Sequence, residues 1–150
     1  MYHTTLPTDA LVTFRNVMHE TRMFGFERAS RTAWELGSMV RAIMTEEKGL
    51  KSVAAPGFQA PGVVVVHTED AGVAGKFIAA GTQIAAGVPF MIDEPKDTKT
   101  FRIGLFGLDK LKDPEKTADT LRSSLEKAVP DDVTAHLSGY IKKAKWTVPS

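Results

Sequence analysis

The chain has 150 residues, of which 43% are hydrophobic and 25% are charged, and this composition is ordinary for one globular domain with a sizeable core. Its formal net charge of +1 at pH 7 gives no reason to expect a nucleic acid or an anionic membrane surface as the partner. The absence of cysteine from the sequence excludes disulfides, thiolate metal sites and cysteine nucleophiles.

Two long helices are predicted at the start of the chain. Thr8 is a suitable N-cap for a helix over residues 8–24, and the apolar residues that follow it are spaced three and four apart: Leu11, Phe14 and Met18. Gly25 then breaks or kinks the chain, and the spacing predicts a second helix over residues 26–48. Gly49 supplies the left-handed residue that ends it. We expect both helices to face the core.

The middle of the chain predicts strands that alternate with helices. The uninterrupted valine run over residues 63–66 predicts a strand that is buried on both faces. A helix is predicted over 73–83, a loop and short strand over 85–92, and a further strand over 101–106. The acid–proline pair at 113–114 is a strong helix start. The buried face of that helix is expected to contain Ala118, Leu121, Leu125 and Ala128.

These elements predict one α+β domain over residues 1–150, in which helices cover one side of a small sheet. The entry helices occupy about 8–48 and the sheet domain about 51–129. An amphipathic helix is predicted over about 131–145, and it is either a docking element or a solvated carboxyl-terminal helix.

Arg102 is the residue whose surroundings predict a binding function. On a strand, side chains alternate between faces, so Arg102 shares a face with Gly104 and Phe106, and the opposite face belongs to its apolar neighbours. Gly104 leaves an open shelf beside the guanidinium, where a carboxylate can bind through two parallel hydrogen bonds. The alternative is an arginine that reaches water along a sheet edge or pairs with an acid on a helix.

Three segments together carry a resemblance to a known family: Tyr2-His3-Thr4-Thr5-Leu6-Pro7-Thr8-Asp9-Ala10-Leu11, Gly81-Thr82-Gln83-Ile84-Ala85-Ala86-Gly87-Val88-Pro89 and Thr100-Phe101-Arg102-Ile103-Gly104-Leu105-Phe106-Gly107-Leu108-Asp109-Lys110-Leu111. From Tyr2 to about Val129 the chain resembles the carboxyl-terminal third of class V, fold type I, pyridoxal-phosphate-dependent aminotransferases, and within them the alanine-glyoxylate and serine-glyoxylate group. The resemblance implies a small, mainly antiparallel sheet with helices packed on one side. It also implies a transferase that moves an amino group between an amino acid and a 2-keto acid such as glyoxylate or pyruvate.

The resemblance assigns roles to three residues of this chain. Arg102 is expected to bind the substrate carboxylate, and Tyr2 and Thr5 are expected to donate hydroxyls to the cofactor phosphate of a neighbouring subunit. The family's Schiff-base lysine belongs to a large domain that would precede Met1, so we expect no catalytic residue and no covalently bound pyridoxal phosphate in this chain alone. Without that lysine the chain is expected to be inactive by itself. Fold relatives that desulfurate cysteine use a cysteine in this region, which the sequence lacks.

Several interpretations of the function remain open from the sequence. In the first interpretation, the chain is a truncated small domain that docks onto a missing pyridoxal-phosphate-binding large domain or onto a full-length homologue. In the second, it is a stand-alone module without catalysis that binds an organic acid or docks as a dimer. In the third, it is a split-gene product. The expected ligand is a small amino or keto acid, with no nucleic acid or membrane as a partner, and a homodimer is a further possibility. No stretch reaches the roughly 18 apolar residues needed to span a bilayer, and the amino terminus is unlike a signal peptide, so the cytoplasm is the expected compartment.

Other polar residues give weaker indications. The four histidines, His3, His19, His67 and His136, show no spacing typical of metal ligands, so no metal site is predicted. The loops Gly57-Phe58-Gln59 and Gly87-Val88-Pro89 are either turns or places where the backbone approaches a ligand.

Overall fold

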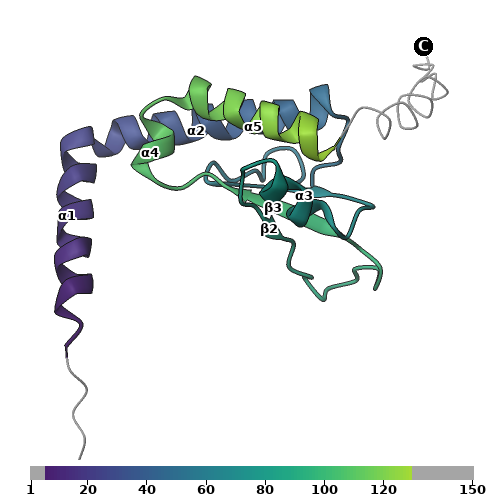
Figure 1. Ribbon diagram of the computed structural model, residues 1–150, viewed down its shortest axis with the longest axis horizontal. Coiled ribbons are helices and arrows are strands. Elements are labelled where there is room, and N and C mark those ends of the chain that lie inside the picture. The colour runs from purple at the N-terminus through teal and green to yellow at the C-terminus, as the bar shows by residue number, and fades with distance from the viewer. Residues whose placement is uncertain (1–5, 130–150) are drawn as a thin grey trace, which may run out of the picture.

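A three-stranded sheet and a layer of helices make up residues 6–129, the part of the chain that the computed structural model describes (Figure 1). The elements follow one another in this order: α1 (Thr8–Phe24), α2 (Phe26–Ala42), the π-helical segment η1 (Ile43–Glu47), β1 (Val63–His67), α3 (Val73–Ala79), β2 (Ala85–Ala86), β3 (Thr100–Gly104), α4 (Leu108–Leu111) and α5 (Pro114–Ala128). The helix predicted over 131–145 lies outside the described residues.

The sheet has the order β1-β3-β2, and both neighbours run antiparallel to the central strand β3. Arg102 lies opposite Val65 of β1 on one side and Ala85 of β2 on the other. Ser52 extends the pairing by a single bridge to Val66 at the outer edge of β1. The predicted α+β class and the mainly antiparallel sheet are therefore confirmed.

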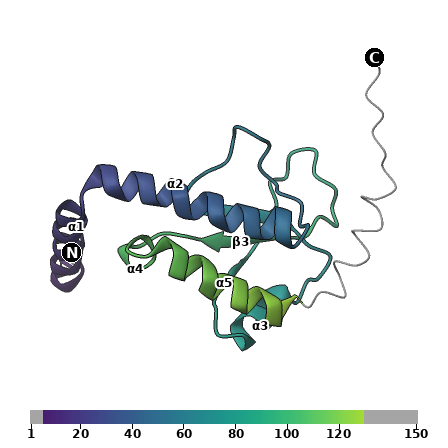
Figure 2. The same cartoon turned by 90° about the horizontal axis from the view of Figure 1, so that it is seen from above.

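Helices α2, α3 and α5 pack on one face of this sheet and form the core with it. In Figure 2, α2 and α5 lie side by side above β3, and α3 lies beside α5. The rings of Phe77 in α3 and Phe101 in β3 meet at the centre, with 5.8 Å between their centroids. The largest side chains that are less than 2% exposed are Phe77, Phe101, Leu36, Ile43, Met44, Leu125, Val40, Val64 and Val66.

The burial of β1 corrects one prediction. Val64 and Val66 are buried, whereas Val63 and Val65 are only partly buried. Helices cover one face of the sheet, so alternate valines point away from the core, and burial on both faces was wrong. A valine run alone does not distinguish a strand covered on two faces from one covered on a single face.

The first helix has the predicted bounds but not the predicted packing. Gly25 separates α1 from α2 with a φ of 94°, a left-handed value that favours glycine. Figure 1 shows α1 turning away from the sheet at this corner, and no residue of α1 is buried. The prediction that α1 faces the core was therefore wrong, because the corner carries its apolar residues beyond the reach of the sheet.

Several helix ends follow the sequence signals, and others do not. Gly49, with a φ of 65°, follows the predicted end of the second helix, whose last residues form η1. Asp113 caps α5 as predicted, since its Oδ1 accepts the N–H of Lys116 at 3.0 Å. Thr8 is the first helical residue rather than the cap, because its N–H donates to the Leu6 carbonyl and Pro7 takes the cap position. Helix α3 is shorter than predicted, because left-handed Gly81 ends it, and α4 was not predicted.

An ion pair joins η1 to α5 across the helical layer. The Arg122 guanidinium donates to both carboxylate oxygens of Glu47, at 3.0 and 2.9 Å, and to Asp119 at 2.6 Å. The hydrogen bonds from Arg122 lower the pKa of Glu47. Because the carboxylate is favoured in the folded chain, this contribution is present above the unfolded pKa of the glutamate and is lost as the pH falls through the folded value.

Gly37 provides a test of how α2 packs on the loop before β1. A Cβ built on Gly37 would lie 2.6 Å from the Pro61 carbonyl oxygen, whereas a Cβ on Gly75 in α3 would meet nothing within 4 Å. We expect Gly37→Ala to lower the free energy of unfolding by about 1–3 kcal/mol through overpacking. Gly75→Ala, the matched control, should raise it by roughly 0.4–1 kcal/mol by restricting the unfolded chain. Urea unfolding measures both, and a shift of the same sign in the two variants would contradict this packing.

Candidate carboxylate site

Arg102 lies at the centre of the sheet on the face that no helix of residues 6–129 covers. Its neighbours in β3, Phe101 and Ile103, are 1% and 5% exposed and point into the core. Arg102 itself is exposed on the opposite face, together with Gly104. The alternation predicted for this strand is confirmed, and the guanidinium is displayed by a central strand rather than by a sheet edge.

The surface around Arg102 is built from small side chains. Across the strands it adjoins Val65 and Ala85, and the next position on its own face is Gly104. A Cβ built on Gly104 would meet only the Phe106 ring, at 3.9 Å, so this side of the shelf is open. The Phe106 ring is 71% exposed and lies against Gly62, where a Cβ would contact it. An open shelf of small residues beside an exposed aromatic ring can receive a planar carboxylate.

No acid pairs with Arg102 within the part of the chain that the structure describes. The ion pairs found there join Lys76 to Asp70, Lys110 to Asp109, and Arg122 to Glu47 and Asp119. Acids on α2 and α5 lie on the other side of the sheet, so the helix-pairing alternative for Arg102 does not occur between residues 6 and 129. The role of Arg102 in binding a carboxylate stays a prediction.

The other residues predicted to bind ligands are placed only in part. Tyr2 and Thr5 lie outside the described residues. In the loop 57–59, Gly57 has a φ of 85° and donates its N–H to the side chain of Gln59, which makes this loop a turn. Gly87 donates its N–H to the Thr100 carbonyl at 2.8 Å and lines a cavity of about 200 Å³ with Pro89. Asp70, Glu94 and Lys99 line the same cavity.

The described residues do not fit a covalent pyridoxal-phosphate site. A Schiff-base lysine needs a desolvated amine that is free to react. Among the lysines that border cavities, Lys76 and Lys110 are each paired with an aspartate, at 2.8 and 2.9 Å. Lys51, Lys99 and Lys116 also border cavities, but they are exposed to water rather than desolvated. Lys48 is buried and already has a partner. Any cofactor of this kind must therefore be held by residues other than these lysines.

Comparisons with known proteins do not assign a family. No protein-family model matches the chain, and no curated protein sequence matches it. Among the described helices, none is long and apolar enough to cross a lipid bilayer. Between residues 6 and 129, no three side chains of the types His, Cys, Asp or Glu converge as a metal-binding group.

The sequence analysis missed two features that bear on binding. The apolar face of α1 is exposed, although its spacing was interpreted as core-facing. A cavity also opens between β3 and α5, at the end of the short strand β2. The first had a sequence signal in Gly25, which separates α1 from the rest. The cavity depends on where β2 and β3 cease to pair, and no local sequence pattern predicts that point.

The poor fit to a covalent cofactor predicts a spectroscopic result. Incubation of the purified chain with pyridoxal phosphate, followed by dialysis, should leave no stable absorbance at about 420 nm from an internal aldimine. The reason is that lysines that are exposed to water or ion-paired form reversible adducts that dialysis removes. A retained band together with one modified lysine in the mass spectrum would contradict this expectation.

Proposed function

We propose that this chain is the small domain of a pyridoxal-phosphate-dependent aminotransferase of class V, and that Arg102 binds the carboxylate of its amino-acid and keto-acid substrates. The observation that carries the proposal is the Arg102 guanidinium, which is exposed at the centre of the sheet and has no ion-pair partner among residues 6–129. The resemblance of the three segments described above supplies the reaction class. The expected compartment is the cytoplasm.

The exposure of Arg102 means that a second surface must complete the site. An ion pair between exposed groups contributes about 0–1 kcal/mol, because water and salt screen it. A guanidinium covered by protein binds a carboxylate far more strongly, since the effective dielectric constant is lower. We therefore propose that a cofactor-binding domain, supplied by another chain or by another part of a longer protein, covers the outer face of the sheet.

Helix α1 provides the second support for such a partner. Its apolar face remains exposed in the single chain: Leu11 is 48% exposed, Phe14 62%, Val17 51% and Met18 56%. Association costs roughly 4–15 kcal/mol of translational and rotational free energy, so a stable complex needs an apolar surface of this kind. We propose that this face docks on the cofactor-binding domain and orients the sheet toward it.

Substitution of Arg102 by lysine tests its role. Lysine retains the charge but cannot make the paired, planar hydrogen bonds, and the loss should be on the order of 1.5–3 kcal/mol in a covered site. In a complex reconstituted with a cofactor-binding domain, Arg102→Lys should lower kcat/KM for amino and keto acids by roughly 10- to 150-fold. Arg31→Lys, at an exposed position on α2, is the matched control and should change nothing. Equal values for the Arg102 variant and the wild type would show that the guanidinium does not bind substrate.

Reconstitution tests the docking face. Mixing this chain with a family large domain that ends before its own counterpart of Tyr2 should produce amino transfer to glyoxylate. Phe14→Glu should abolish the complex, because it places a charge in the apolar face of α1. Met23 lies nine residues further on, about 180° around the helix at ~100° per residue, so Met23→Glu is the matched control.

The outcomes of the mixing experiment distinguish a transaminase domain from a module without catalysis. A complex that forms with wild type and Met23→Glu, but not with Phe14→Glu, and that transfers amino groups supports the transaminase domain. A demonstrated complex whose activity stays at the background of the large domain would instead favour the module without catalysis. Analytical ultracentrifugation and the glyoxylate-dependent loss of the amino donor measure the two quantities.

A further inference from the structure

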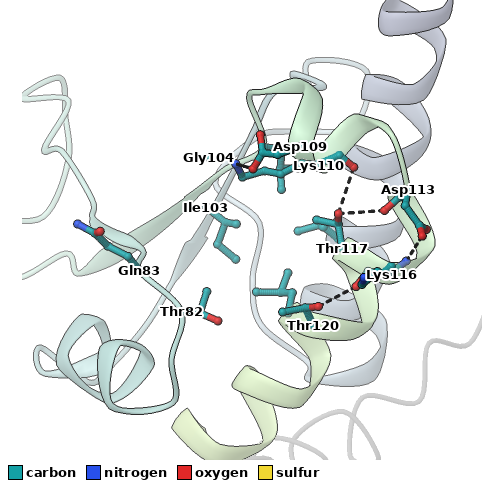
Figure 3. A pocket seen from close by; sticks show the side chains of 13 residues that line it. Thr82, Gln83, Ile103, Gly104, Asp109, Lys110, Asp113, Lys116, Thr117 and Thr120 are labelled. Atoms are coloured by element: carbon teal, nitrogen blue, oxygen red, sulfur yellow. Dashed lines mark hydrogen bonds and ion pairs between the residues drawn. The ribbon is translucent and has the colours of Figure 1, made fainter. Parts of the chain in front are cut away.

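A cavity of about 430 Å³ lies between β3 and the α4–α5 corner, on the helical side of the sheet (Figure 3). Thr82 and Gln83, which follow α3, form one side of it, and Lys116, Thr117 and Thr120 of α5 form the other. The volume falls within the roughly 300–1,000 Å³ that is typical of small-molecule sites. Arg102 points to the opposite face of the sheet and does not line the cavity.

The floor of the cavity is apolar and rigid. It is formed by the side chains Val40, Ile103, Leu105 and Leu121, all of which are 5% exposed or less. These side chains come from α2, α5, β3 and the residue that follows β3, so their positions are set by core packing. An apolar group of a ligand would be desolvated against this floor, which favours binding.

A free backbone edge faces the cavity at Gly104. Backbone groups of alternate strand residues point to opposite edges. Leu105 donates to the Gly62 carbonyl on the β1 side, and the Thr100 carbonyl accepts from Gly87 on the β2 side, so the Gly104 amide faces the β2 side. Strand β2 ends its pairing at Ala85, opposite Arg102, and no hydrogen bond joins Gly104 to Gln83. The Gly104 N–H and C=O are thus available to a ligand.

The rim of the cavity has two acidic and two basic side chains, and one of each is free to bind a ligand. Asp109 and Lys110 neutralise each other at 2.9 Å. Asp113 uses Oδ1 to cap α5, which leaves Oδ2 without a partner among residues 6–129. The Lys116 ammonium likewise makes no ion pair within that range. One free carboxylate oxygen and one free ammonium therefore stand on the same side of the cavity.

We propose that this cavity binds an apolar α-amino acid as a second ligand of the chain. The side chain would lie on the apolar floor, the carboxylate would bind the Lys116 ammonium and the Gly104 N–H, and the ammonium would bind Asp113. A phosphate-bearing ligand fits less well, since the unpaired oxygen of Asp113 would repel it and only the Lys116 ammonium is free to balance its charge. A purely apolar ligand would leave the Gly104 amide desolvated without a hydrogen bond. A zwitterion with an apolar side chain satisfies all of these groups.

Calorimetry on the full chain with leucine as the probe tests the chemical class of the ligand. Leucine should bind the wild type, whereas leucinamide, which lacks the carboxylate, and N-acetyl-leucine, which lacks the ammonium, should each bind at least tenfold more weakly. Alanine should also bind more weakly, because it leaves the apolar floor uncovered. No heat with leucine at millimolar concentration, or equal affinity for leucine and both blocked analogues, would overturn the proposal.

Variants locate the site. Thr120→Trp should fill the cavity and remove leucine binding, whereas Ser123→Trp on the same helix, outside the cavity, should not. Lys116→Ala should weaken leucine binding at least tenfold, and Lys112→Ala, an exposed lysine that does not line the cavity, should leave it unchanged. Asp113→Ser keeps a side-chain oxygen for the cap but removes the charge, so it should bind leucine and N-acetyl-leucine with nearly equal affinity.

Arg102→Lys separates this site from the one on the outer face of the sheet. If the cavity binds leucine, Arg102→Lys retains wild-type affinity, whatever the fate of the proposed transaminase function. Loss of leucine binding in Arg102→Lys, with retention in Thr120→Trp and Lys116→Ala, would place the amino acid at Arg102 and overturn the proposal. Circular dichroism and the urea midpoint establish that each variant is folded, and Lys116→Ala decides the outcome if Thr120→Trp is not.

Discussion

Among residues 6–129, helices cover the sheet on one face only, and this asymmetry determines where the candidate binding groups of these residues lie. Because side chains alternate along a strand, β3 directs Phe101 and Ile103 into the core and Arg102 to the open face. The Phe77–Phe101 contact anchors the covered face, so the backbone that carries Arg102 is held by core packing. The strand backbone that carries the guanidinium therefore has a defined position, although the side chain itself is exposed to solvent.

Helix α1 and Arg102 both favour a second protein surface as a partner, for different physical reasons. A soluble domain rarely exposes a contiguous apolar surface without a partner, and α1 presents Leu11, Phe14, Val17 and Met18 along one face. The exposed guanidinium gains little from a carboxylate until water is excluded from it. Both features become favourable when a second protein surface covers them. The proposal of a small domain that acts with a cofactor-binding partner rests on this agreement.

The shortness of β2 has a separate consequence on the covered face. The chain that comes from α3 joins the sheet only at Ala85, and just two residues of β2 pair with β3, so the Gly104 amide faces a cavity. The cavity and the Arg102 side chain lie on opposite faces of β3. The two proposed sites are thus independent in their contacts but share one supporting strand.

The sequence by itself determined the elements whose signals are local. Gly25 and Gly49 mark helix ends because left-handed backbone favours glycine, Asp113 and Pro114 begin α5 through capping chemistry, and strand alternation separates Arg102 from Phe101 and Ile103. Only the tertiary structure decided what those faces meet. The apolar spacing of α1 is the same whether the helix packs on a core or stands apart from it, and the valines of β1 do not reveal that one face is uncovered. The cavity beside Gly104 depends on where β2 diverges from β3, which are separated by a loop of more than ten residues. Burial and cavity shape arise from contacts between distant segments, and a local pattern specifies the shape of an element but not its neighbours.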